Sequence, residues 1–204
     1  QEHVPELVFN VVDRGDLDGA MPVAANQRAI TVAPEVVHLS RFAKAYKLRP
    51  DDELPSRVDL CLHNGDVAES LQCGPLARMW RSVAYMLDGS GLDELPAKGS
   101  QPENEMQFVL LPTLKSLLEE RAAAGDVQTC VSLCEVLQVI QPDETTRIPG
   151  LSLNLVREWY LAYIDLLRDM CLFSLASFII GTCKDTFIGA LNQQSTTCVA
   201  LYNF

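Results

Sequence analysis

Apolar residues recur with the period of an α-helix over most of this chain, and this period constrains the fold more than any other feature. The clearest stretch follows the break at residues 73–75, where six apolar side chains share one helical face while Arg78 and Arg81 point away from it. The six are Leu76, Met79, Trp80, Val83, Ala84 and Leu87. Such a helix needs a neighbour to cover its apolar face, so the pattern predicts packed helices.

Prolines and capping residues divide the first half of the chain into further helices. A helix is expected to begin at Pro34, because a first helical position tolerates the missing N–H, with Phe42 and Tyr46 on its apolar side. Ser56, followed three residues later by Asp59, resembles a capping box that opens the next helix. Two helices are therefore expected before residue 73.

Residues 112–140 predict a helical hairpin. Pro112 is expected to start its first helix, Gly125 to end it, and Asp126 to cap the second helix at once. Cys130 and Cys134 then lie four residues apart on the apolar side of the second helix. Loops rich in glycine, proline and polar residues are expected before this hairpin and after it.

A helix expected from about Leu153 to Met170 is apolar on two sides, which predicts an inner helix with neighbours on both. Its first face carries Val156, Trp159, Tyr160, Tyr163, Leu167 and Met170. Its second face carries Leu155, Ala162 and Leu166. The uncharged run between Asp169 and Lys184 is shorter than the ~20 residues of a membrane span, so it predicts a buried core helix.

Helix pairs joined by short turns, without a precise repeat period, predict an all-α fold. The expected architecture is an irregular α-solenoid of stacked antiparallel helix pairs, with short strand-like segments at both ends. The expected order is a strand-like segment (1–33), a first helical part (34–88), a loop or linker (89–111), a second helical part (112–195) and a terminal strand (196–204).

Composition narrows the class of function. The 27 acidic and 16 basic residues give a formal net charge of −11. This charge argues against nucleic-acid partners and against docking on an anionic membrane, both of which require clustered lysine and arginine. Seven cysteines, most of them in apolar helical stretches, indicate reduced, buried thiols and no disulfide framework. Neither a signal peptide nor an initiator Met opens the chain, which fits a piece of a longer protein.

Candidate chemistry is sparse. Cys130 and Cys134 share a helix face, but no histidine lies near them in the sequence, so buried hydrophobic side chains are favoured over half of a zinc site. His63 follows Cys61 by two residues, which on a helix directs the two side chains to different sides. The sequence therefore predicts no catalytic, cofactor-binding or metal-binding residue, and a thiol-dependent enzyme is kept as an alternative.

Several short motifs, the most informative of them between residues 156 and 197, occur in a characteristic order. The motif residues are Trp80, Gly125, Asp126, Trp159, Tyr160, Tyr163, Asp165, Leu167, Asn192, Gln193, Thr196 and Thr197. In this order they resemble one family, the WD-repeat subunit of the SEA/GATOR-two complex, which feeds amino-acid signals to TOR. In that family the matching block lies between a helical solenoid and a C-terminal RING-like zinc domain.

The resemblance implies a non-enzymatic scaffold segment of a complex that activates TOR complex one by opposing its inhibitory GTPase-activating branch. The implied partners are a Seh-type β-propeller and other SEA/GATOR-two subunits, with no nucleic acid and no direct membrane insertion. The implied place is the cytoplasm, peripherally at the lysosomal or vacuolar membrane. Zinc and any ubiquitin-ligase activity would belong to the adjoining RING-like domain. A coat-type or nuclear-pore-type α-solenoid scaffold is the alternative, because it would have the same packing of helix pairs in a different complex.

Overall fold

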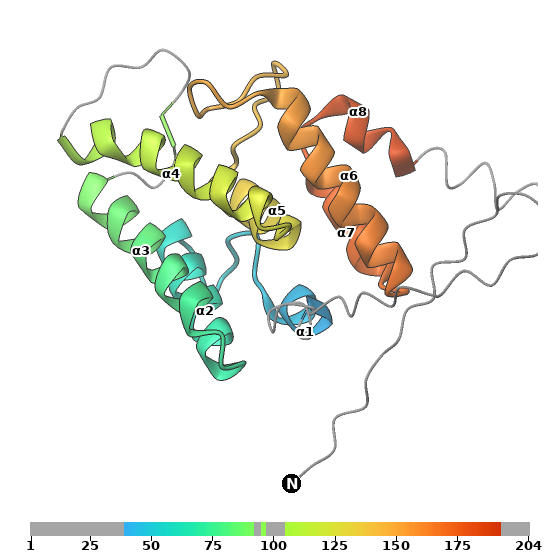
Figure 1. Cartoon of the computed structure of the whole chain (residues 1–204), viewed down its shortest axis with the longest axis horizontal. Coiled ribbons are helices and arrows are strands. Elements are labelled where there is room, and N and C mark those ends of the chain that lie inside the picture. Colours follow the sequence, from blue (N-terminus) through green and yellow to red (C-terminus); the bar gives the residue numbers. More distant parts are fainter. Residues whose placement is uncertain (1–38, 92–94, 97–104, 193–204) are drawn as a thin grey trace, which may run out of the picture. The chain divides into compact units, whose positions relative to one another are not determined.

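The computed structural model describes residues 39–91, 95–96 and 105–192, and in these residues it contains eight α-helices and no strand (Figure 1). They are α1 (Leu39–Ala45), α2 (Arg57–Ser70), α3 (Gly74–Ser90), α4 (Glu105–Ala123), α5 (Val127–Leu137), α6 (Leu153–Asp169), α7 (Phe173–Thr182) and α8 (Thr186–Gly189). The all-α class is confirmed. The strand-like segments expected at 1–33 and 196–204, and the helix start at Pro34, lie outside the described residues.

Helix caps form where the sequence predicted them. The Ser56 hydroxyl accepts the N–H of Asp59, and the Asp59 carboxylate accepts the N–H of Ser56, so the capping box of α2 is confirmed. Asp126 caps α5 by accepting the N–H of Thr129 at 3.0 Å. Gly125, in the turn before it, has a φ of +79°, which only glycine adopts without strain.

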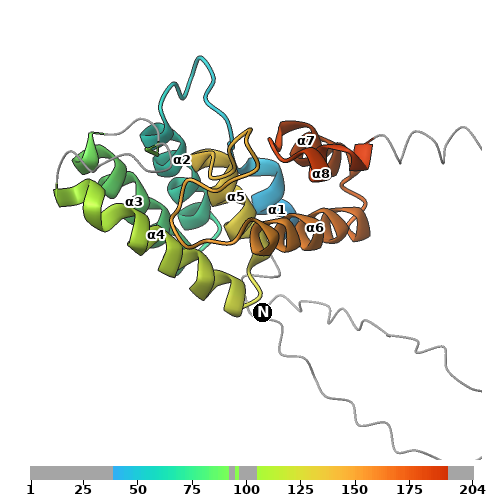
Figure 2. The ribbon, with the colours of Figure 1, turned by 90° about the horizontal axis from the view of Figure 1, so that it is seen from above.

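Each helix packs on the next one along the chain, and α2 also packs against α5 and α6 against α8. A turn at residues 71–73 folds α3 back along α2, and short turns likewise join α4 to α5 and α6 to α7 (Figures 1 and 2). This sequence of neighbours agrees with stacked helix pairs. The irregular α-solenoid arrangement stays a prediction.

The most deeply buried helix is α5, and α6, which was predicted to have neighbours on both sides, packs against α5 and also against α7 and α8. All ten residues of α5 from Gln128 to Leu137 are buried, and helices α2, α4 and α6 surround it (Figure 2). On α6 the first apolar face is buried from Val156 to Leu167, Met170 is half-buried, and Ala162 on the second face is exposed. The reason is charge: α5 has a single charged residue, Glu135, whereas α6 carries charged side chains along its outer surface.

Helix α4 begins at Glu105, so the expected loop 89–111 is too long and Pro112 lies inside a helix. Residues 89 and 90 likewise belong to the end of α3. Leu110, Leu114 and Leu118 follow each other at four-residue spacing and are all buried. Their common apolar stripe extends the helix past the proline, although the proline itself removes one backbone hydrogen bond.

Helix α7 is an outer helix, so the prediction of a buried core helix is wrong. Ala176, Ile179 and Ile180 pack inward, but Phe173 and Phe178 on its other side are 61% and 44% exposed. The absence of charge predicted burial on all sides. In the described part of the chain nothing covers the outer side of this helix.

Candidate functional site

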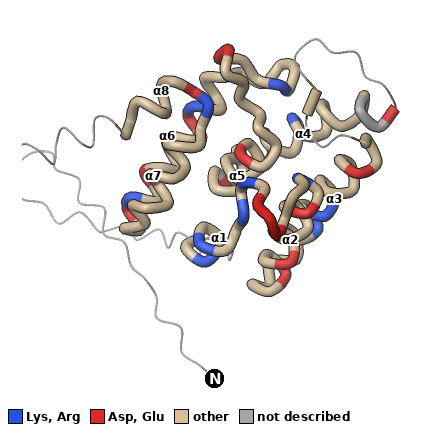
Figure 3. The backbone as a smooth tube through the Cα atoms, turned by 180° about the vertical axis from the view of Figure 1, so that it is seen from behind, with Lys and Arg blue, Asp and Glu red and all other residues tan. Residues whose placement is uncertain are grey.

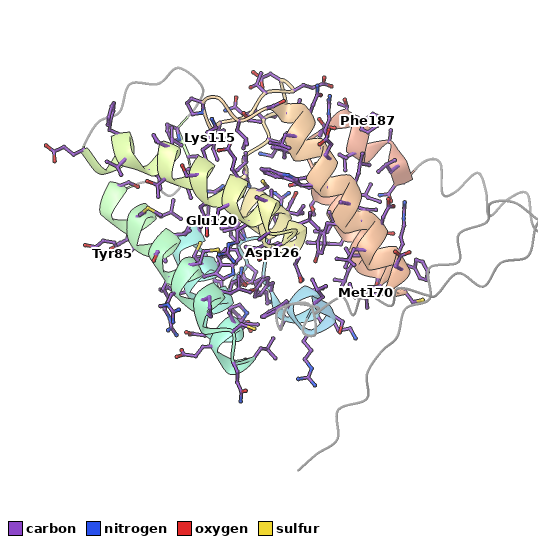
Figure 4. The ribbon with its side chains drawn as sticks, in the orientation of Figure 1. Tyr85, Lys115, Glu120, Asp126, Met170 and Phe187 are labelled. Atoms are coloured by element: carbon purple, nitrogen blue, oxygen red, sulfur yellow. The ribbon has the colours of Figure 1, made fainter. Side chains whose placement is uncertain are left out.

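The residues of the predicted motifs gather around α5. Trp80 and Tyr160 are two of the largest fully buried side chains, and Tyr163 is buried beside them in the core. Asp126 lies at the beginning of α5, where the α4–α5 turn approaches α1 (Figure 4). Polar contacts occur near both ends of α5, and each end joins a different set of helices.

At the first end of α5, hydroxyl and amide groups link four helices. The Gln128 side-chain amide donates to the Leu39 carbonyl of α1 at 3.2 Å and to the Tyr163 hydroxyl of α6 at 3.3 Å. Trp80 of α3 donates its indole N–H to the Tyr46 hydroxyl at 3.1 Å, and the two rings meet edge to face at 5.5 Å. Burial raises the pKa of Tyr163 to about 12 and that of Tyr46 further, so both hydroxyls stay protonated at neutral pH.

A cavity of about 70 Å³ lies at this end, between α1, α3, α6 and the α4–α5 turn. Tyr46, Gln128 and Asp126 are among its polar lining groups. Its apolar lining includes Leu39, Phe42, Leu76, Val127 and Leu166. The second carboxylate oxygen of Asp126, Oδ2, is buried and has no hydrogen-bond partner among the described residues. The cavity thus combines a mainly apolar wall with a few polar groups.

At the other end of α5, Glu135 is buried as a charged residue. Its side chain is 3% exposed, accepts the Tyr160 hydroxyl at 2.7 Å, and pairs with the Arg49 guanidinium at 2.8 Å. Arg49 also donates to the carbonyl of Thr182 at the end of α7. Burial first, and the Glu135 charge second, raise the pKa of Tyr160 well above its ordinary value. This contact joins α5, α6, α7 and the segment after α1.

A third polar contact connects α6 to α8. Arg157 donates through Nε to the buried Asp185 carboxylate at 2.9 Å, and the hydrogen bond with Asp185 raises the pKa of Arg157. The same guanidinium lies 5.7 Å from the ring centre of Phe187, within cation–π range. Phe187 itself is exposed, on the opposite side of the molecule from Tyr85 (Figure 4).

The remaining motif residues have plain structural positions. Trp159 and Leu167 are buried in the core along α6. Asp165 is exposed on α6 and faces Arg168 at 3.4 Å. Asn192 is the last described residue, and its side-chain amide lies close to Gly181 of α7. The other three motif residues, Gln193, Thr196 and Thr197, lie outside the described residues.

The buried thiols are placed for packing. Cys61, Cys130 and Cys134 lie in the core, and burial raises the pKa of Cys61 and of Cys130 to about 12. The His63 ring faces the Ala45 carbonyl at 3.3 Å. Among the described residues no group of three histidine, cysteine or carboxylate side chains could hold a metal ion.

Sequence reasoning missed the polar contacts of α5 and the exposure of α7. Glu135 could have been found, because a lone charge in an otherwise uncharged helix needs a buried counter-charge. Its partner Arg49 precedes it by 86 residues, and nothing local in the sequence connects the two. The bond from the Arg57 guanidinium to the Val136 carbonyl, 3.0 Å long, is equally non-local.

No protein-family model matches the chain, and no curated protein matches it. Across the described residues, the helices are too short or too polar for any of them to cross a membrane.

Proposed function

We propose that this chain is a non-enzymatic helical scaffold that binds other proteins. The observation that carries the proposal is the outer face of α7, which combines exposed aromatic rings with small side chains. No residue between Asp169 and Lys184 is charged, as the uncharged tube of α7 shows in Figure 3. The uncharged outer face consists of the exposed residues Phe173, Ser174, Ser177, Phe178 and Gly181.

The shape of this face suits a helical partner. Ser174, Ser177 and Gly181 lie along its middle, while Phe173 and Phe178 flank them. Small residues between two aromatic side chains allow another helix to approach closely and give it apolar area to bury. A helix without charge on any side is normally covered, and exposed apolar surface often marks protein contacts.

The motif resemblance supports a particular complex. On that basis the scaffold is a segment of a SEA/GATOR-two-type assembly, which opposes the GTPase-activating branch that inhibits TOR complex one. Its partners would be a Seh-type β-propeller and other subunits of that complex, at the lysosomal or vacuolar membrane. Zinc would be bound in the adjoining RING-like domain. A coat-type or nuclear-pore-type scaffold is the second candidate, favoured by the same helix-on-helix packing.

The thiol-dependent enzyme is the weaker alternative. A nucleophilic cysteine needs an accessible, lowered-pKa thiol beside a base, but Cys61 is fully buried and its pKa is raised. His63, two residues away, bonds to a backbone carbonyl instead. These contacts favour a packing role for both residues.

The test is a pull-down with this chain as bait, with partners identified by mass spectrometry. Ser174→Glu/Ser177→Glu puts two charges on the uncharged outer face of α7 without removing buried area. Ser82→Glu, which puts one charge on the exposed side of α3, is the control. We expect the α7 variant to lose partners that both the wild-type chain and the control retain, because burying an unpaired carboxylate is costly.

The identity of the partners decides between the candidates. Recovery of a Seh-type propeller or other SEA/GATOR-two subunits, lost in the α7 variant, would support the proposal in full. Coat or nuclear-pore subunits lost in the same way would favour the second candidate. Partners retained by the α7 variant, or no partner with the wild-type chain, would contradict a binding role for this face.

A further inference from the structure

The described part of the chain ends beside the uncharged outer face of α7. Asn192, the last described residue, has its side-chain amide close to Gly181, which is one of the five residues of that face. On the same face, Phe173 and Phe178 are 61% and 44% exposed, and nothing among the described residues covers them. Residues 193–204 therefore continue from a point next to an apolar surface that lacks cover.

The sequence of residues 193–204 matches the character of this face. The segment contains no charged residue, and most of its apolar residues follow Thr197: Cys198, Val199, Ala200, Leu201, Tyr202 and Phe204. A charged occupant would lose its hydration on this face without gaining a counter-charge, whereas an uncharged segment has no such cost. The other stretches outside the described residues, 1–38, 92–94 and 97–104, all contain charged residues. Charge therefore selects residues 193–204 among them.

The segment is also long enough to cover the face. Phe173 and Gly181 lie eight residues apart on α7, which is about 12 Å at the usual rise of about 1.5 Å per residue. Residues 193–195 can bridge up to about 10 Å, and residues 196–202 span about 23 Å when extended, at about 3.3 Å per residue. A segment tethered this closely has an effective concentration in the millimolar range, so a short apolar contact is enough to hold it.

We infer that residues 196–204 bind back onto the uncharged outer face of α7 in the same chain. Val199, Leu201 and Tyr202 supply apolar area, and the exposed ring of Phe178 receives it. The inference goes beyond the proposed scaffold function, because it names what covers this face before a partner binds. A partner of the face then has to displace residues 196–204.

Protein-observed NMR on this chain tests the contact. We expect nuclear Overhauser effects from the Leu201 methyl groups to the ring of Phe173 or Phe178, because apolar side chains in contact approach within about 4.5 Å. A mixed sample of ¹³C-labelled and unlabelled chains separates contacts within one chain from contacts between two chains. Contacts found only between chains would identify a second copy as the occupant and overturn the inference.

Val199→Asp/Leu201→Asp is the decisive variant, because it places two charges in the apolar part of the segment and leaves the described helices unchanged. It should abolish the contacts and shift the backbone amide signals of α7. Gln193→Asp/Gln194→Asp adds the same charge before the apolar part, so this matched control should keep the contacts. Contacts that are absent from the wild-type chain, or that survive in the decisive variant, would overturn the inference.

The pull-down with this chain as bait separates the inference from the proposed function. Contacts seen by NMR, together with no recovered partner, would support the inference and contradict the proposed function. A partner bound through α7, together with no such contacts, would do the reverse. If both occur, Val199→Asp/Leu201→Asp should recover more of the partner than the wild-type chain does, because the competing segment is released; equal recovery would contradict the competition.

Discussion

Removing Arg49 isolates the buried charge of Glu135 and tests whether this contact holds the helices together. The Glu135 side chain is 3% exposed, and Arg49→Met would leave the Tyr160 hydroxyl as its hydrogen-bond donor among the described side chains. At the observed separation of 2.8 Å, with an effective dielectric constant of 20, the attraction is ~6 kcal/mol before desolvation is subtracted. We expect a net loss of ~3–5 kcal/mol in the free energy of unfolding, the range for breaking one side of a buried pair.

The assay is urea denaturation at pH 7, followed by far-ultraviolet circular dichroism. Lys47→Met is the matched control. Lys47 lies two residues before Arg49 and pairs with Asp51 at the same distance, 2.8 Å, but both of these side chains are solvent-exposed. We expect no measurable loss for this control, because water screens the pair. Because the two ion pairs have the same length, the difference in stability loss between the two variants measures the effect of burial.

A further result follows from the same reasoning. Adding Glu135→Gln to Arg49→Met should recover part of the lost stability, and the double-mutant cycle measures the coupling. A loss below about 1 kcal/mol at pH 7 would refute the argument, because it would mean that Glu135 is effectively solvated.

Two other predictions concern the core and its thiols. Trp159→Ala should cost ~3–5 kcal/mol in urea denaturation, because the side chain is 4% exposed and its removal leaves a cavity; a loss below ~1 kcal/mol would place it at a surface. Stability should also fall above about pH 9, since the pKa of Cys61 and Cys130 is about 12 in the folded protein and near 9 when unfolded. Stability from these raised pKa values is complete below pH 9 and lost as the pH approaches 12, with each thiol costing ~2 kcal/mol at pH 10.5. Denaturation at pH 8, 9.5 and 10.5 measures this, and Cys61→Ala/Cys130→Ala should flatten the dependence; an equally steep fall in that variant would contradict the assignment.

Local signals in the sequence predicted most of the helices. The capping box at Ser56 and the cap at Asp126 each depend on residues three apart, so the sequence contains both partners side by side. The six-residue apolar stripe of α3 is likewise buried in full. The start of α4 was missed because proline favours the first position of a helix, so Pro112 was expected to begin it. A stripe of buried leucines extends the helix before the proline once α3 and α5 are packed alongside.

The candidate site was harder to predict because its contacts are non-local. Pairing Arg49 with Glu135, or Gln128 with Tyr163, requires knowing which helices are neighbours. The prediction that α7 would be a buried core helix was wrong for a related reason. An apolar composition indicates that a helix surface is normally buried, but it does not indicate whether residues of the same chain bury it. The exposure of the α7 aromatic residues depends on which of the described helices pack against α7, and its own sequence does not specify those neighbours.

The contacts of α5 give two tyrosines of α6 a structural role. Gln128 and Glu135 lie two turns apart on α5, and each bonds to a different tyrosine of α6, Tyr163 and Tyr160. A shift of α6 by one turn would break both bonds and leave Glu135 with a weaker set of partners. The two bonds together therefore fix the direction and the register of the helix pair, as buried polar groups do in coiled coils.

It follows that the motif residues and the residues of the proposed partner surface have different roles. Trp159, Tyr160 and Tyr163 are buried, so they determine how this chain folds. The proposed partner surface is the uncharged outer face of α7, and none of its five residues belongs to the motif. Two proteins with the same motif could thus share a fold and bind different partners, and substitutions on α7 test partner choice while substitutions of the motif test stability.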